Sequence, residues 1–261
     1  MILWSASSWS LWKECPRKYQ LRKIGRTMSP FVDRDPVLAC LSVPGLFVDK
    51  MLQLWLHRGV FGDTAWLQEN AEMVWRMVSS ETKPKWSSAL EESRIKKEAM
   101  SGLRTATKLV MELLREDDEL LVQPGFMEQL SEDFGITGAA DLLIVRRNSG
   151  SVLIDFKNAH RRERMTRDQL VIYQVGLTRK LGIKLDRAGY LLFNPRLECW
   201  KWFRISPAQE EKYLRRLEMA TREVKAGCFE PRWNHFTCMR FCDVRFSCEV
   251  YQGIVGKGKA L

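Results

Sequence analysis

The segment from Gly138 to Lys157 constrains the fold most, because it has the pattern of two short apolar strands joined by a tight turn. Asn148-Ser149-Gly150 is a typical hairpin turn sequence. Asp141 and Asp155 each lie seven residues from Asn148, so a hairpin centred there places them nearly opposite each other. Side chains alternate between the two faces of a strand, so Lys157 projects on the same side as Asp155.

Two carboxylates across a sheet repel each other, and burial among apolar neighbours is costly unless a cation is present. Lys157 could supply that charge in a structural ion network. The other candidate is a divalent metal, since Mg²⁺ or Mn²⁺ binds one or two carboxylates together with water and phosphate oxygens. Gly138, Lys157 and the basic net charge favour the metal.

The remaining pattern predicts helices first and a mixed region afterwards. Helices are expected near 5–19, from Pro44 to about 115, after Thr166 and from Pro207 to about 226. Strands are expected over 126–134, 136–145, 151–157, 188–193 and 199–204. This order predicts an α/β core with a helical N-terminal elaboration. We expect one domain over 1–261, with an N-terminal segment 1–30, a helical region 44–120, a core 124–226 and a cysteine segment 228–261.

The chain carries 42 Lys and Arg against 32 Asp and Glu, a formal charge of +10, which favours a polyanionic partner such as nucleic acid. No stretch reaches the roughly 18 uncharged apolar residues of a membrane span. We therefore expect a soluble cytoplasmic protein with no membrane partner. Seven cysteines include three within eleven residues, Cys238, Cys242 and Cys248. In a reducing compartment such crowding indicates a metal or iron–sulfur site.

These motifs together resemble one family. Gly138-x-x-Asp141, Asp155-Phe156-Lys157 and Gln169-x-x-x-Tyr173 are similar to the successive motifs of the PD-(D/E)XK nuclease superfamily. The stretch from Ser7-Ser8 to Cys15-Pro16-Arg17-Lys18-Tyr19 resembles the opening of its RecB-like exonuclease branch. The C-terminal cysteines resemble the iron–sulfur subgroup of that branch, which includes CRISPR-associated RecB-like nucleases and the AddB nuclease domain.

The resemblance implies a restriction-endonuclease-like core, a mixed central sheet flanked by helices, and a set of catalytic roles. Asp141 and Asp155 would be ligands of Mg²⁺ or Mn²⁺, with the carbonyl of Phe156 as a third, and Lys157 would stabilise charge on the phosphate. Gln169 and Tyr173 share one helix face and would point at the active site. From the residues alone, Gln169 also completes a capping box with Thr166, and Tyr173 could belong to the core.

The family usually adds a metal-binding histidine four residues after a glycine on an early helix. Here Gly45 is followed at that spacing by Asp49, which can also bind a hard cation, and His57 is the other candidate. Each could instead be an ordinary helix residue. Glu128 is a further acidic candidate, although a solvated strand-edge position is the simpler interpretation.

For the cysteines, the resemblance implies a four-iron four-sulfur (4Fe-4S) cluster bound by Cys15, Cys238, Cys242 and Cys248. Such an iron–sulfur clasp would join the two ends of the chain. The first spacing is Cys-x₃-Cys, where the family typically has Cys-x₂-Cys. Zinc therefore stays an alternative to iron and sulfur, and Cys228 or His235 could replace one ligand.

The function implied by the resemblance is a metal-dependent DNA exonuclease acting on single strands or ends, in recombination and repair, phage DNA processing or CRISPR adaptation. A basic loop is placed to bind phosphates; its arginines are Arg161, Arg162, Arg164 and Arg167. The alternatives are a non-catalytic nucleic-acid-binding module on the same fold and a zinc-stabilised scaffold. The sequence leaves cleavage polarity and oligomeric state open.

Overall fold

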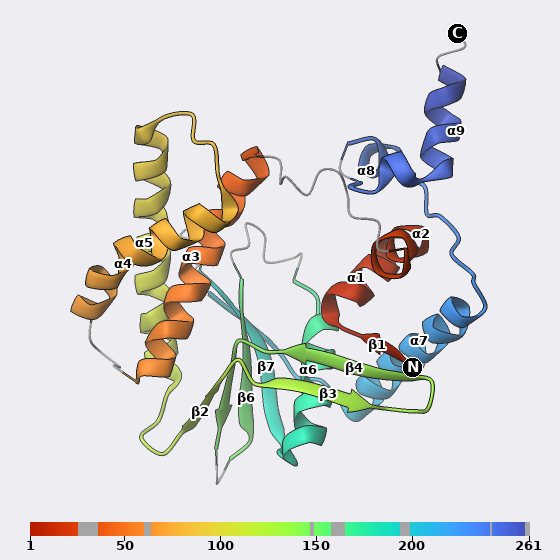
Figure 1. Ribbon diagram of the computed structural model, residues 1–261. Helices are drawn as coiled ribbons and strands as arrows, with labels where there is room; N and C mark the ends of the chain where they lie inside the picture. The colour runs from red at the N-terminus through yellow and green to blue at the C-terminus, as the bar shows by residue number, and fades with distance from the viewer. Residues whose placement is uncertain are drawn as a thin grey trace. The chain divides into compact units, whose positions relative to one another are not determined.

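The computed structural model describes residues 1–25, 36–59, 64–146, 149–157, 165–193, 199–240 and 242–258. The chain divides into two compact units (Figure 1). Unit 1 comprises Met1–Asp33, Gln129–Thr137 and Ala208–Leu261, and unit 2 comprises Arg34–Glu128 and Gly138–Pro207. The chain passes from unit 2 to unit 1 along β3 (Gly125–Gln129) and returns along β4 (Phe134–Ala139).

Unit 2 is built on a mixed five-stranded sheet with the order β2-β5-β6-β7-β8. Only the β6–β7 pair is parallel; the other neighbours are antiparallel. The strands are β2 (Glu119–Val122), β5 (Leu142–Val145), β6 (Ser151–Lys157), β7 (Leu185–Leu192) and β8 (Cys199–Phe203). This mixed sheet flanked by helices is consistent with the restriction-endonuclease-like fold that the sequence predicts.

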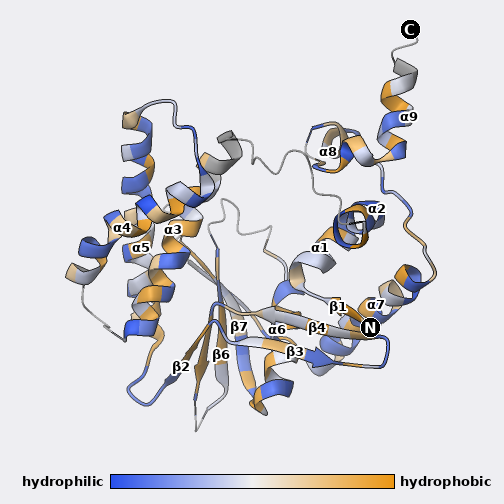
Figure 2. Cartoon of the chain, in the orientation of Figure 1, coloured by the Kyte–Doolittle hydropathy of each residue, from blue (hydrophilic) through white to orange (hydrophobic). Residues whose placement is uncertain are grey.

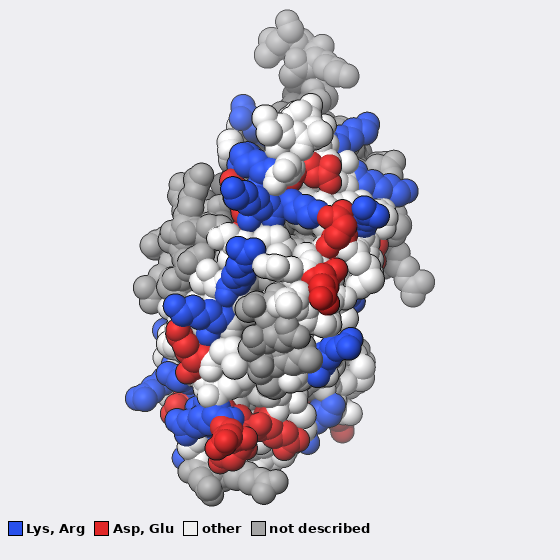
Figure 3. All heavy atoms as spheres, turned by 90° about the vertical axis from the view of Figure 1, so that its left-hand side faces the viewer, with Lys and Arg blue, Asp and Glu red and all other residues white. Residues whose placement is uncertain are grey.

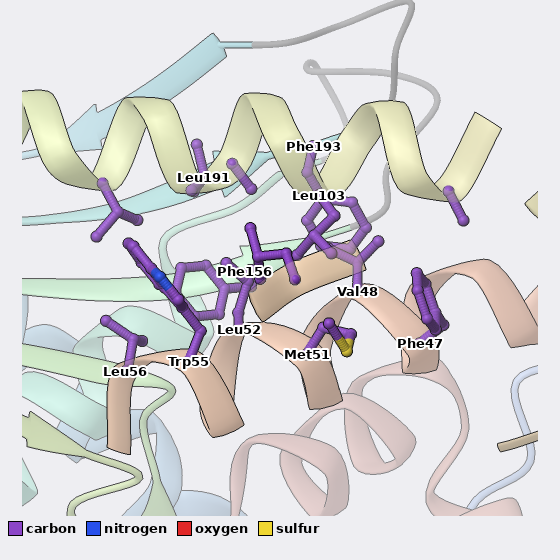
Figure 4. Close-up of a cluster of buried hydrophobic side chains, with 14 of the residues drawn as sticks. Phe47, Val48, Met51, Leu52, Trp55, Leu56, Leu103, Phe156, Leu191 and Phe193 are labelled. Atoms are coloured by element: carbon purple, nitrogen blue, oxygen red, sulfur yellow. The ribbon is translucent and has the colours of Figure 1, made fainter. Parts of the chain in front are cut away.

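One face of this sheet packs against three helices, α3 (Pro36–Arg58), α4 (Thr64–Thr82) and α5 (Ala89–Leu113). Alternate residues of β6, including Ile154 and Phe156, enter this core. Figure 4 shows Phe156 beside apolar side chains of α3 and α5 such as Leu52 and Leu103. The apolar character of β2 and β6 is visible in orange in Figure 2.

The opposite face of the sheet packs against α6 (Asp168–Leu181), which contacts β6 and β7. The helix ends at Gly182, whose φ of 63° is the left-handed conformation that favours glycine. Its N-cap is Arg167, which makes no side-chain capping hydrogen bond. The capping box expected from Thr166 and Gln169 is therefore wrong, and the Gln169 amide donates hydrogen bonds to Asp155 and Tyr173 instead.

Unit 1 is organised around Trp4 of β1 (Ile2–Trp4), which pairs in parallel with β4. The Trp4 indole donates a hydrogen bond of 2.9 Å to Thr221 on α7 (Pro207–Lys225) and stacks on Tyr19 with ring centroids 5.2 Å apart. The other elements are α1 (Ala6–Glu14), α2 (Pro16–Tyr19), a π-helix (Gln20–Ile24), α8 (His235–Arg240), a 3₁₀ turn (Arg245–Ser247) and α9 (Glu249–Gly258).

Three local expectations differ from the structure. The single strand expected over 136–145 is broken at Ala140, so β4 and β5 belong to different sheets. Helix α3 begins at Pro36 and continues through Pro44, which the sequence pattern placed at its start. Strands β1 and β2 were not expected. Both are short, and they form by pairing with later strands, β1 with β4 and β2 with β5.

The charged surface of α4 and α5 is mixed rather than uniformly basic. Oppositely charged residues one turn apart pair along these helices, as in Arg76 with Glu72 and Arg94 with Glu98. Figure 3 shows basic and acidic side chains interspersed on the face that it draws. None of the described helices combines the length and the unbroken apolar character that a membrane span requires.

Candidate active site

The β5–β6 hairpin brings the two predicted aspartates together. The strands pair Leu142 with Ile154 and Leu143 with Leu153, and the same register continued by one residue sets Asp141 opposite Asp155. The predicted hairpin register is therefore confirmed. Asp141 lies in the break between β4 and β5, where the chain has left one sheet and has not yet joined the other.

Asp141 is fixed by the neighbouring strand. Its Oδ2 accepts a hydrogen bond of 2.6 Å from the backbone N–H of Phe156. Burial, together with the nearby carboxylates of Asp155 and Asp49, raises the pKa of Asp141 to about 8. The Phe156 amide and Lys157 oppose this rise without cancelling it. Without an additional cation, Asp141 is therefore protonated at neutral pH.

Asp155 is almost fully buried, with 1% of its surface exposed. Its Oδ1 accepts a hydrogen bond of 2.8 Å from the Gln169 amide. Its Oδ2 lies 2.6 Å from Lys157 Nζ in an ion pair. Burial raises the pKa of Asp155 although Lys157 lowers it. One carboxylate oxygen is thus held by an amide, and the other has capacity for a cation.

Asp49 on α3 belongs to the same electrostatic group. Its charge raises the pKa values of Asp141 and Asp155, and burial raises its own pKa despite Gln53 and Lys157. The Gln53 amide donates a hydrogen bond of 2.9 Å to Asp49 Oδ2. Gln53 was not among the expected site residues, although its spacing of four residues from Asp49 on a helix was a usable signal.

His57, the other candidate for this position, lies two turns further along α3 and is exposed. Glu128 lies on β3, and its charge is not among the main causes of the raised pKa values of Asp141 and Asp155. The structure therefore groups Asp49 with the hairpin aspartates and leaves His57 and Glu128 outside this group.

Gln169 and Tyr173 lie one turn apart on α6, and both contribute to the site. The Gln169 amide donates one hydrogen bond to Asp155 and another, of 2.7 Å, to the Tyr173 hydroxyl oxygen. Burial raises the pKa of Tyr173, and Asp155 adds to the effect. Gly138 is explained by the same packing, because a Cβ there would lie 3.1 Å from both Tyr173 and Phe126.

The charge balance of this group fits a divalent cation. Among the described residues, three carboxyl groups, from Asp49, Asp141 and Asp155, lie near the Lys157 ammonium, and Lys50 adds a smaller positive effect at Asp49. Hard cations prefer such oxygen ligands. No three His, Cys, Asp or Glu side chains within the described ranges are close enough together to surround a metal ion as they stand. A cation held here would therefore take fewer than three of these carboxylates as they stand, with water or phosphate oxygens as its other ligands.

The expected phosphate-binding arginines are only partly described. Arg161, Arg162 and Arg164 lie outside the described residues. Arg167 is exposed at the start of α6, where its guanidinium lies over the Phe203 ring, 5.9 Å from the centroid.

The four candidate cluster cysteines line one cavity in unit 1. The cavity has a volume of about 260 Å³, and Cys15, Cys238, Cys242 and Cys248 all face it. Cys228 and His235 are exposed and do not line it. Cys15 is thus placed with the C-terminal three although more than two hundred residues separate them in the sequence.

Backbone amides are directed at two of these sulfurs. The N–H of Arg232 lies 3.4 Å from Cys15 Sγ, and the N–H of Asn234 lies 3.4 Å from Cys238 Sγ. Burial raises the pKa of Cys242, while the Lys18 ammonium lowers it. Amide donors and a cation around sulfur are the environment that stabilises metal-bound thiolates. The donors around the sulfurs suit metal-bound thiolates, although the four thiols do not surround a single metal ion as they stand.

Comparisons with known proteins identify the family of the chain. The family model described as the PD-(D/E)XK nuclease superfamily matches residues 3–249. No curated protein matches the chain. Among solved structures, the crystal structure of SSO0001 is similar at 17% sequence identity and a TM-score of 0.40, covering 61% of this chain and 79% of that chain.

Proposed function

Because the chain belongs to the PD-(D/E)XK nuclease superfamily, whose members are generally metal-dependent nucleases, we propose that it is a Mg²⁺- or Mn²⁺-dependent DNA exonuclease acting on single strands or ends. The observation that carries the proposal is the group of half-buried Asp49 and Asp141 and buried Asp155 beside Lys157. Within the described ranges its carboxyl groups outnumber the ammonium groups that act on them, Lys157 and Lys50, and this balance favours a cation.

The roles of the residues follow from their contacts. Asp49, Asp141 and Asp155 would hold the cation, with the Phe156 carbonyl as a further ligand. When bound, the cation would polarise the scissile phosphodiester and lower the pKa of a bound water. Lys157 lies against Asp155 and is one-third exposed, so its ammonium can also reach a phosphate oxygen.

Gln169 and Tyr173 hold the carboxylates in place. The Gln169 amide fixes Asp155 Oδ1, and the Tyr173 hydroxyl accepts from the same amide, so the amide orientation is set from both sides. Arg167, together with Arg161, Arg162 and Arg164, would bind the DNA backbone next to this site. Exonuclease action, single-strand or end preference and a role in recombination, repair, phage DNA processing or CRISPR adaptation rest on the RecB-like motifs.

We propose further that the cysteine cavity holds a 4Fe-4S cluster bound by Cys15, Cys238, Cys242 and Cys248. Its support is the common cavity and the amide donors around Cys15 and Cys238. A single zinc ion needs its four sulfurs at about 2.3 Å from one point. The cavity of about 260 Å³ that the four cysteines line together with other residues has room for the larger inorganic cluster, which supports this choice.

The test is degradation of end-labelled single- and double-stranded DNA by the purified protein with Mg²⁺, Mn²⁺ or EDTA. We expect metal-dependent release of short products, and a loss of at least about a hundredfold for Asp155→Ala and Lys157→Ala. Asp117→Ala, which removes an exposed carboxylate, is the matched control. Wild-type rates in folded Asp155→Ala would overturn the assignment, and DNA binding without cleavage by the wild-type protein would indicate a non-catalytic module.

A further inference from the structure

The first turn of α6 has no cap of its own. Its N-cap residue is Arg167, whose side chain has no acceptor and makes no capping hydrogen bond. A helix start without a cap loses about 1 kcal/mol compared with one capped by Ser or Asp. Yet the second residue of this helix, Gln169, holds Asp155 at 2.8 Å, so this weak start must be fixed by other contacts.

Two residues of the sheet supply those contacts. The Tyr190 hydroxyl donates a hydrogen bond of 2.8 Å to the carbonyl of Thr166, and Lys201 Nζ donates one of 2.7 Å to the carbonyl of Met165. Lys201 and Arg167 both lie over the ring of Phe203, at 5.3 and 5.9 Å from its centroid. The residues that lead into α6 are thus bound to β7 and β8.

These donors lie in the same row of the sheet as the catalytic aspartate. The β6–β7 pairing sets Asp155 beside Tyr190, and the β7–β8 pairing sets Tyr190 beside Lys201. Residues in register on neighbouring strands project from the same face. The row that contains Asp155 therefore also contains Tyr190 and Lys201, which bind the residues leading into α6. Helix α6 in turn carries Gln169, whose amide donates to Asp155.

We infer that Tyr190 and Lys201 are positioning residues of the metal site, which act by anchoring the start of α6 so that Gln169 stays on Asp155 Oδ1. This inference rests on the proposed function. When Gln169 occupies Oδ1, the other oxygen of Asp155 is directed to Lys157 and the cation. Release of the anchor frees the carboxylate to rotate, which weakens metal binding without removing any ligand.

Conservative variants test the anchor. Lys201→Met and Tyr190→Phe each remove one donor at nearly constant volume, and Lys201→Arg keeps a donor. Lys212→Met on the exposed side of α7 is the matched control. The first readout is hydrogen exchange in metal-free protein of the amides of residues 171–174, which begin with the Val171 N–H that donates to the Arg167 carbonyl. The second is the Kd for Mn²⁺, measured from the electron paramagnetic resonance signal of free Mn²⁺.

We expect exchange in the first turn of α6 to accelerate about tenfold and Mn²⁺ binding to weaken by about the same factor in Lys201→Met and Tyr190→Phe, since each loses one hydrogen bond. Lys201→Arg and Lys212→Met should stay near wild type. In a Gln169→Ala background, Lys201→Met should not weaken Mn²⁺ binding further, because the lysine acts through Gln169.

Unchanged exchange with normal Mn²⁺ binding in both donor variants would overturn the inference. Full additivity of Lys201→Met with Gln169→Ala would also overturn it, because the lysine would then act by another route. If the wild-type protein binds no Mn²⁺, the proposed metal function fails instead. The exchange rates still decide in that case whether Tyr190 and Lys201 anchor α6.

Discussion

The backbone N–H of Phe156 donates a hydrogen bond of 2.6 Å to Asp141 Oδ2, so a side chain at a break in one strand takes the position of a backbone acceptor on its neighbour. The break at Ala140 thus places the Asp141 carboxyl group in the candidate active site. A continuous strand would direct a backbone carbonyl at Phe156, whereas the break presents a carboxylate there. The same carboxylate then lies opposite Asp155.

The stability of the metal-free protein should fall as the pH rises. Folded Asp141 has a pKa raised to about 8 from an ordinary value of 3.8. The folded state therefore binds a proton that the unfolded state has released, and this stabilising effect, complete below about pH 4, is lost as the pH rises through about 8. Urea unfolding in EDTA at several pH values measures it.

Asp141→Asn should flatten this pH dependence, and Mg²⁺ should restore stability at high pH, because the cation replaces the proton. Asp117→Asn, at an exposed carboxylate, should leave the pH dependence unchanged. A free energy of unfolding that increases with pH in EDTA would contradict the raised pKa.

Asp49 should contribute to metal binding, and His57 should not. We expect Asp49→Asn to weaken the apparent Mg²⁺ affinity of cleavage about tenfold or more, since one anionic ligand becomes neutral. His57→Ala, at an exposed position on the same helix, should change it by less than about twofold. Titration of the cleavage rate with Mg²⁺ gives both values, and the reverse order would show that the histidine is the ligand.

Gly102 should not tolerate alanine, although it lies in a helix. A Cβ at this position of α5 would overlap the backbone carbonyl of Phe193. We expect Gly102→Ala to destabilise the protein by about 1–3 kcal/mol, against a gain of up to about 1 kcal/mol from helix propensity. Gly253→Ala in α9, where a Cβ meets nothing within 4 Å, should be neutral or stabilising. Thermal unfolding of the two variants decides between packing and propensity.

The cysteine cavity should make the protein brown when it is purified without oxygen. Each change to serine at Cys15, Cys238, Cys242 or Cys248 should lower the iron content and the melting temperature, because the cluster joins distant segments. Cys228→Ser is the matched control, since this thiol is exposed and outside the cavity. Iron and sulfide analysis provides the measurement. Colourless protein that contains stoichiometric zinc would show that the cysteines bind zinc and not an iron–sulfur cluster.

The central hairpin could be predicted because its information is local. Asn148 lies midway between Asp141 and Asp155, and alternation puts Lys157 on the face of Asp155; the register confirms this geometry. The helix from Pro207 was predicted for a similar reason, since proline at the first helical position has a preset φ.

The rest depends on contacts between distant residues. The pairing of β1 with β4 places Leu3 beside Gly135. Strand β1 has only three residues, which are too few to show a sequence periodicity that predicts a strand. The break at Ala140 has no turn sequence, because it is imposed by two different sheets. Gln169 has the sequence spacing of a helix cap, and only the position of Asp155 explains why its amide turns to the sheet.

The aromatic packing around Trp4 gives the protein an internal optical reporter. Trp4 and Trp12 both contact Tyr19, and Tyr19 ends the four-residue helix that begins directly after Cys15. A strongly absorbing cluster bound at Cys15 would accept excitation energy from these indoles. Their emission would then brighten as iron is lost. Fluorescence could thus follow the assembly of one unit inside the intact chain.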